Sequence, residues 1–126
     1  MAKVLVVDDE ASVRSVLRKT LERLDHEVCD AAEGGEALRH LETVAFDLVI
    51  TDVYMAAMDG MELLVRIQQR GLRVPEVVMS GGGCKPAEEV LAMASSCGAV
   101  AALDKPFTPE QLRAAVDPLL AGPSAA

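Results

Sequence analysis

The stretch FDLVITDVYMAAMDG, Phe46–Gly60, contains an aspartate at the end of a short apolar run. Leucine, valine and isoleucine at residues 48–50 precede Asp52, with one threonine between them. A run of this kind is typical of a strand that is buried on both faces of a sheet. A carboxylate in such a place costs free energy unless a partner or a ligand binds it. The fold and the function therefore both depend on what contacts Asp52.

Short apolar runs of the same kind recur along the chain and alternate with segments of helical spacing. The runs predict strands at residues 3–9, 27–32, 47–52, 74–80 and 99–104. Apolar spacing and helix-start residues predict helices at residues 11–24, 37–41, 61–71, 86–97 and from 108 onward. Gly34 and Gly35 are expected to separate the second strand from the second helix. This alternation predicts an α/β fold, with a doubly wound parallel sheet covered on both faces.

The last predicted helix has a capping box at its start and a proline further along. Thr108 is the expected N-cap, Pro109 the first helical residue and Gln111 the N3 residue that completes the box. Pro118 is expected to kink or end the helix. Near the middle of the chain, Met58–Gly60 is expected to shape a loop and start a helix rather than to take part in chemistry.

Composition predicts one domain and argues against some partners. The chain has 126 residues, 51% of them hydrophobic, which is enough for one core. We expect a domain over residues 1–121, a disordered tail at 122–126 and no output domain. A net charge of −8 argues against nucleic acid, because phosphate backbones require a basic face. Since no apolar run is long enough for a membrane span and the three cysteines are scattered, we expect a cytoplasmic protein.

Five polar residues fall where predicted strands end. Asp8 and Asp9 end the first strand, Asp52 the third and Ser80 the fourth, and Lys105 follows the fifth. The carboxyl ends of parallel strands meet at one edge of the sheet, where ligands bind. Three carboxylates gathered there repel one another unless cations lie between them. Lys105 supplies one positive charge, and Mg²⁺ is a second cation that suits oxygen ligands. Such a group of residues favours phosphoryl-transfer chemistry.

Four motifs carry a resemblance to a known family: VVDDE, ITDVYMAAMDG, VVMSGGG and LDKPF. In order and separation they resemble the receiver domain of two-component response regulators, in its single-domain chemotaxis-type form. The resemblance covers Lys3 to about Leu120. It implies a flavodoxin-like fold of five βα units with the strand order 2-1-3-4-5.

The resemblance also implies roles for individual residues. Asp52 would be the phosphoacceptor, a nucleophile that takes a phosphoryl group from a phosphohistidine. Ser80 would bond a phosphate oxygen and shift its loop on activation. Lys105 would pair with the phosphate, aimed by a cis peptide before Pro106.

The same resemblance implies a Mg²⁺ site. Asp9 would be a direct ligand and Asp8 would act largely through water, while Asp52 and the backbone carbonyl of Tyr54 complete the protein ligands. The phosphorylated domain would slowly hydrolyse its own acyl phosphate and would have no other enzymatic activity.

The partners implied by the resemblance are a sensor histidine kinase or a histidine phosphotransfer protein. The output would be contacts with a further protein, or passage of the phosphoryl group onward. A monomer or a weak, phosphorylation-dependent dimer is expected.

The sequence departs from the family pattern at three places. Ala102 stands where an aromatic residue is usual, so the signal would leave the site by repacking of the fourth helix or by backbone shifts. Ala56 replaces a proline, and Gly81–Gly83 follow the hydroxyl residue, which predicts a mobile loop before the fourth helix. Ala56 and Ala102 favour a second hypothesis, a degenerate receiver that binds partners without phosphorylation. A metal-dependent phosphatase is a poorer third, because no general acid is evident.

Overall fold

The fold is built on one parallel sheet. It is described by a computed structural model, which places residues 2–53, 59–80, 87–105 and 107–125. The strands of the sheet are β1 (Lys3–Val7), β2 (Glu27–Ala31), β3 (Leu48–Asp52), β4 (Glu76–Ser80) and β5 (Ala99–Asp104). They pair in the order β2-β1-β3-β4-β5, and every pair is parallel. The predicted α/β class and strand order are confirmed.

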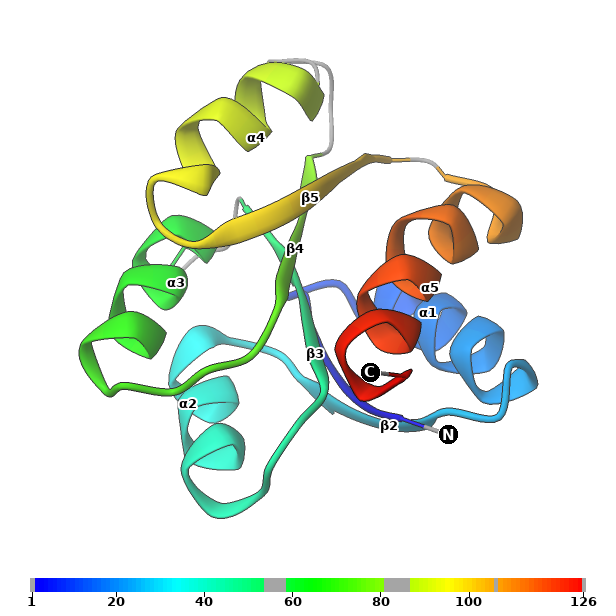
Figure 1. Cartoon of the computed structure of the whole chain (residues 1–126), viewed down its shortest axis with the longest axis horizontal. Coiled ribbons are helices and arrows are strands. Elements are labelled where there is room, and N and C mark those ends of the chain that lie inside the picture. Colours follow the sequence, from blue (N-terminus) through cyan, green and yellow to red (C-terminus); the bar gives the residue numbers. More distant parts are fainter. Residues whose placement is uncertain (1, 54–58, 81–86, 106, 126) are drawn as a thin grey trace.

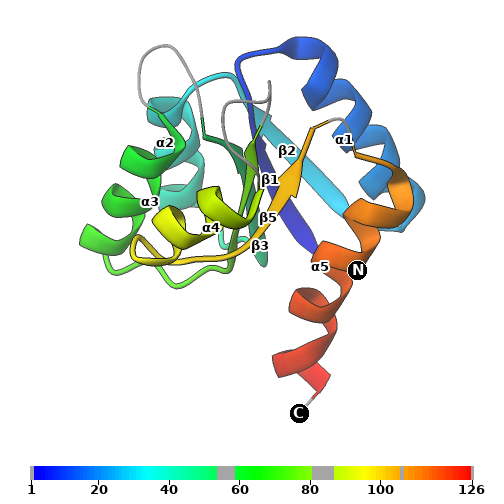
Figure 2. The same ribbon diagram turned by 90° about the horizontal axis from the view of Figure 1, so that it is seen from above.

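Helices cover both faces of the sheet. They are α1 (Ala11–Arg23), α2 (Gly34–Thr43), α3 (Gly60–Gln69), α4 (Ala87–Ser95) and α5 (Pro109–Ala125). Figures 1 and 2 show α1 and α5 on one face and α2, α3 and α4 on the other. Within the described residues, none of these helices is both long enough and apolar enough to cross a membrane.

Alternate residues of each central strand belong to different cores. In β1, Val4 and Val6 pack with α1 and α5, while Leu5 and Val7 pack with α2 and α3. All four side chains are fully buried. Burial on both faces explains why β1 is a continuous apolar run instead of an alternating pattern.

The second helix begins earlier than predicted, because Gly34 and Gly35 belong to its first turn. The N–H of Ala37 donates to the carbonyl of Glu33 at 3.1 Å. The Glu36 carboxylate accepts from the N–H of Ala32 at 2.9 Å. These two bonds hold the first turn in place, which offsets the conformational entropy that glycine loses in a helix.

The last helix continues further than predicted. The capping box is confirmed: Thr108 Oγ1 accepts from the N–H of Gln111 at 3.1 Å, and Gln111 Oε1 accepts from the N–H of Thr108 at 2.8 Å. The helix does not end at Pro118, one of the two expected outcomes at that proline, because it extends to Ala125. The disordered tail at residues 122–126 stays a prediction. Leu119 and Leu120 pack against the core beyond the proline, and this burial offsets the lost hydrogen bond.

Candidate functional site

The site lies at the carboxyl edge of the sheet, as the strand order requires. Asp52 is the last residue of β3 and Ser80 the last of β4. Asp8 follows β1 directly, and Lys105 follows β5. Asp8, Asp52 and Ser80 are nearly or fully buried. The structure therefore brings residues from four strands to one edge, although they are far apart in sequence.

Lys105 joins the two buried carboxylates. Its Nζ donates to Oδ2 of Asp8 at 2.7 Å and lies 3.3 Å from Oδ2 of Asp52. Burial lowers the pKa of Lys105, but the hydrogen bond to Asp8 and the charge of Asp52 outweigh burial and raise this pKa above its ordinary value of 10.5. The ammonium therefore stays charged at neutral pH and offsets part of the repulsion between the carboxylates.

Both carboxylate oxygens of Asp8 already have partners. Oδ2 accepts from Lys105, and Oδ1 accepts from the N–H of Glu10 at 2.9 Å. Arg14 donates to the carbonyl oxygen of Asp8 at 2.6 Å. These bonds hold the turn after β1 in place.

The residues after β1 fit a hard divalent cation. One carboxylate oxygen from each of Asp8, Asp9 and Glu10 lies within 4.8 Å of the others. Asp9 and Glu10 are exposed, while Asp8 is fully buried. An all-oxygen set with a buried anchor suits Mg²⁺. Glu10 was not among the ligands predicted from the sequence; its only signal was its place directly after the two aspartates.

The backbone around Asp52 is held by the start of α3. The N–H of Gly60 donates to the carbonyl of Val53 at 2.8 Å. Asp59 caps the helix, since its side chain accepts from the N–H of Glu62 at 2.8 Å. A Cβ on Gly60 would lie only 2.3 Å from the carbonyl oxygen of Asp52. Gly60 is thus a positioning residue, consistent with the shaping role expected for Met58–Gly60.

Ser80 has a partner that sequence reasoning missed. Its Oγ donates to Oδ1 of Asp104 at 2.8 Å. The two residues face each other in the β4–β5 register, and the N–H of Lys105 donates to the carbonyl of Ser80 at 2.8 Å. Asp104 carried no signal of its own, because only the strand register places it beside Ser80.

Several predicted features lie outside the described residues. They are the carbonyl of Tyr54, the Ala56 substitution, the Gly81–Gly83 loop, and Pro86 and Pro106. Ala102 is described: it is partly buried, faces Val78 in the β4–β5 register and packs against the cluster beneath α4. The route of the signal through α4 stays a prediction.

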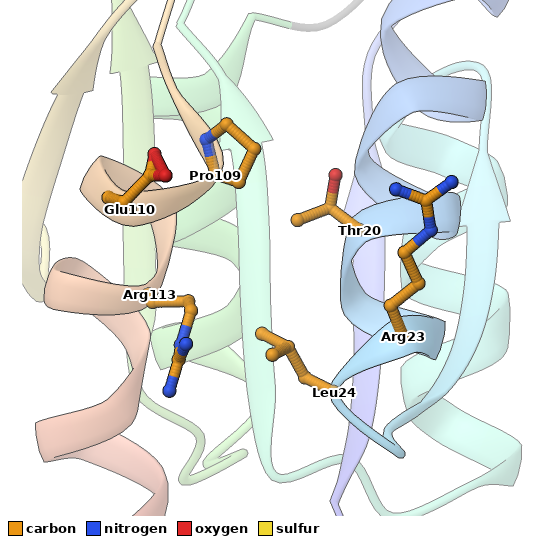
Figure 3. Close-up of a pocket in the computed structure, with 6 residues that line it drawn as sticks. All are labelled: Thr20, Arg23, Leu24, Pro109, Glu110 and Arg113. Atoms are coloured by element: carbon orange, nitrogen blue, oxygen red, sulfur yellow. The ribbon is translucent and has the colours of Figure 1, made fainter.

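A hollow of about 200 Å³ lies away from these residues, between α1 and α5. Figure 3 shows its lining, which is Thr20, Arg23, Leu24, Pro109, Glu110 and Arg113. None of the residues at the carboxyl edge lines this hollow. It is therefore separate from the candidate site.

Comparison with known protein families agrees with the arrangement of residues at this edge of the sheet. The family model of the response regulator receiver domain matches residues 4–117. The chain belongs to the response regulator receiver family. Receiver domains are signalling modules of two-component systems that interact with histidine kinases and phosphotransfer proteins, and they bind Mg²⁺ at an acidic pocket.

Relatives of this receiver domain include proteins of two lengths. Chemotaxis protein CheY1 of Helicobacter pylori (strain J99) is 35% identical over 122 residues, which cover 94% of this chain and 96% of that protein. Alkaline phosphatase synthesis transcriptional regulatory protein PhoP of Bacillus subtilis is 35% identical over 118 residues, which cover 94% of this chain but 48% of PhoP. The chain thus spans about half the length of such transcriptional regulators.

A solved structure supports the same assignment. Chemotaxis protein CheY4 of Vibrio cholerae has a TM-score of 0.86 and 34% sequence identity, covering 95% of this chain and 99% of that one. The receiver fold therefore extends over nearly all of the sequence.

Proposed function

We propose that this receiver domain accepts a phosphoryl group on Asp52 and signals through the resulting change in protein contacts, or passes the group onward. The observation that carries the proposal is the pair of contacts made by Lys105, 2.7 Å to Asp8 and 3.3 Å to Asp52. They place an ammonium beside a buried carboxylate at the ligand-binding edge of the sheet. An ammonium in that position can pair with a phosphoryl oxygen on Asp52.

The transfer step exchanges one bond to phosphorus for another. A carboxylate oxygen of Asp52 bonds to phosphorus while the P–N bond of a donor phosphohistidine breaks. The electron pair of that bond goes to the imidazole nitrogen. In slow self-hydrolysis, a water oxygen bonds to phosphorus, and the bond to Asp52 breaks to release phosphate and the free carboxylate. Positioning and charge neutralisation account for most of the catalysis in such steps.

The residues that would hold Mg²⁺ are Asp9 directly, Asp8 through water, Asp52 and the carbonyl of Tyr54, with Glu10 close by. When bound, the metal supplies positive charge next to the phosphoryl oxygens. Lys105 supplies the second positive charge, and Ser80 is the proposed hydroxyl donor to a phosphoryl oxygen. The proposed partners are a sensor histidine kinase or a histidine phosphotransfer protein, and an output protein that recognises the phosphorylated form.

Intact-mass measurement tests the phosphoacceptor directly. The protein is incubated with Mg²⁺ and acetyl phosphate or phosphoramidate, and the expected result is a gain of one phosphoryl group. The gain should vanish in Asp52→Asn and persist in Asp117→Asn, a matched change at an exposed position of α5. Omission of Mg²⁺ should reduce the gain strongly.

The alternative is a degenerate receiver that binds partners without phosphorylation, which the alanine at position 102 favours. Folded protein that gains no phosphoryl group and fails to bind beryllofluoride, a phosphoryl mimic, would establish that alternative and overturn the proposal.

A further inference from the structure

The end of β4 is held to the end of β5 by two hydrogen bonds of different kinds. One joins backbones, from the N–H of Lys105 to the carbonyl of Ser80 at 2.8 Å. The other joins side chains, from Ser80 Oγ to Oδ1 of Asp104 at 2.8 Å. The Ser80 side chain is buried, with 3% of its surface exposed, whereas Asp104 is exposed. The orientation of the Ser80 hydroxyl is thus set by a carboxylate on the neighbouring strand.

A serine hydroxyl has one proton to donate. In this structure the proton is committed to Asp104, so it is not directed at Asp52. A phosphoryl oxygen on Asp52 needs the same proton. Both acceptors are anionic, and bonds of a neutral donor to an anionic acceptor are stronger than neutral ones. The two acceptors therefore compete, and Ser80 must leave Asp104 before it can bond a phosphoryl group.

The negative charge of Asp104 also disfavours a phosphoryl group on Asp52. Lys105 pairs with Asp8 and Asp52, and Asp104 forms no ion pair among the residues placed in the structure. Its negative charge lies one hydrogen bond away from a residue at the proposed phosphoryl site. A phosphoryl group on Asp52 would be repelled by this charge, and it would also compete with Asp104 for the hydroxyl proton of Ser80.

We propose that Asp104 is a positioning residue that holds Ser80 in the unphosphorylated arrangement and so opposes binding of a phosphoryl group at Asp52. The inference rests on the proposed function, since it concerns the same site. It assigns to Asp104 a role in the balance between the unphosphorylated and phosphorylated states, and the sequence alone did not indicate that role for this residue.

Beryllofluoride binding, measured by calorimetry with Mg²⁺, tests the proposal. Asp104→Ala removes the acceptor and should tighten binding about tenfold, the effect of a hydrogen bond to a charged group. The backbone bond between Lys105 and Ser80 remains, so the strand ends stay paired, which circular dichroism can check. Asp117→Ala, which removes an exposed carboxylate from α5, should leave the affinity unchanged.

A double-mutant cycle distinguishes the hydrogen bond from the charge. If Asp104 acts mainly through the hydroxyl, Asp104→Ala should tighten beryllofluoride binding much less in the Ser80→Ala background than in the wild type, because only the effect of its charge remains there. An equal gain from Asp104→Ala with and without the hydroxyl would overturn the proposal, because the effect would then be that of charge alone.

The same measurements separate this inference from the proposed function. Wild-type protein that binds beryllofluoride with the same affinity as Asp104→Ala overturns the role of Asp104 and leaves the phosphoacceptor in place. Failure of every variant to bind overturns both. Binding by Asp104→Ala but not by the wild type supports both.

Discussion

Nζ of Lys105 donates a hydrogen bond to Oδ2 of Asp8 at 2.7 Å, across 97 residues of sequence. The Asp8 side chain is fully buried and the Lys105 side chain is 16% exposed. This ion pair therefore connects the first strand of the fold to the last inside the protein. Removal of one partner leaves a buried charge without compensation, which is far more costly than loss of a surface pair.

Lys105→Met should lower the free energy of unfolding by about 3 kcal/mol at pH 7, measured by urea denaturation. Mg²⁺ should restore part of this loss, because a cation bound near Asp8 replaces the missing charge. Lys3→Met is the matched control: its pair with Glu27 is half exposed and should be worth less than about 1 kcal/mol. Equal stability of the two variants would contradict a structural role for the buried pair.

Gly60→Ala should impair both stability and acceptance of a phosphoryl group. A Cβ at this position would lie 2.3 Å from the carbonyl oxygen of Asp52 and 2.9 Å from Cα of Val53, so the backbone at the site must move. We expect a loss of about 1–3 kcal/mol, as for other overpacked sites, and slower phosphorylation by acetyl phosphate.

Gly35→Ala is the control for Gly60→Ala, because the new methyl group would meet only the flexible side chains of Glu33 and Arg39. Alanine also favours a helix over glycine by about 1 kcal/mol, so this variant should be neutral or stabilising. A phosphorylation rate unchanged in Gly60→Ala would show that the close approach does not position Asp52.

Glu76 should make the protein less stable as pH rises from about 4.5 to about 7. The residue is 3% exposed, and its Oε2 has no hydrogen-bond partner among the placed residues. Burial raises the pKa of Glu76 from its ordinary value of 4.5 to about 7. The folded state therefore binds a proton that the unfolded state releases in this range, and stability falls until both states are ionised.

The unfolding free energies of wild type and Glu76→Gln, compared across this pH range, isolate the effect. Glutamine stays neutral, so the variant should gain about 2 kcal/mol or more relative to wild type between pH 4.5 and 7, since one pKa unit is about 1.4 kcal/mol. Glu89→Gln, at an exposed position of α4, should show no such trend. A pH-independent difference for Glu76→Gln would refute the elevated pKa.

Thr108→Ala should destabilise the protein by about 1 kcal/mol, because it removes the acceptor that caps the N–H of Gln111 at the start of α5. Thermal unfolding of this variant and of Thr43→Ala provides the comparison. The Thr43 hydroxyl only donates to carbonyls at the end of α2, so its loss should cost less. Similar melting temperatures for the two variants would argue against the capping box.

Beryllofluoride should change amide exchange in α4 and α5. At position 102, which packs beneath α4, alanine has no side-chain rotamer that could carry a signal, so repacking of α4 or backbone shifts must do so. Hydrogen exchange measured with and without beryllofluoride checks this expectation, with Asp52→Asn as the control. Unchanged exchange in α4 and α5, despite binding, would rule out this route.

Local patterns in the sequence were sufficient for much of this fold. The buried runs at β1 and β3 are continuous and apolar because both faces of each strand are covered, and that pattern is visible in a few consecutive residues. The capping box at Thr108 and Gln111 is likewise a local signal, since both partners lie within one helical turn. Polar residues at strand ends also indicated which edge of the sheet would hold the site.

The pairing of side chains across the sheet depended on tertiary structure. Ser80 meets Asp104 because of the register between β4 and β5, and Oδ2 of Asp8 is occupied because Lys105 reaches it from the other end of the chain. Packing of the residues after Pro118 likewise explains why α5 continues past that proline. Local sequence specifies periodicity and caps, whereas distances between residues far apart follow only when strand register and packing bring them together.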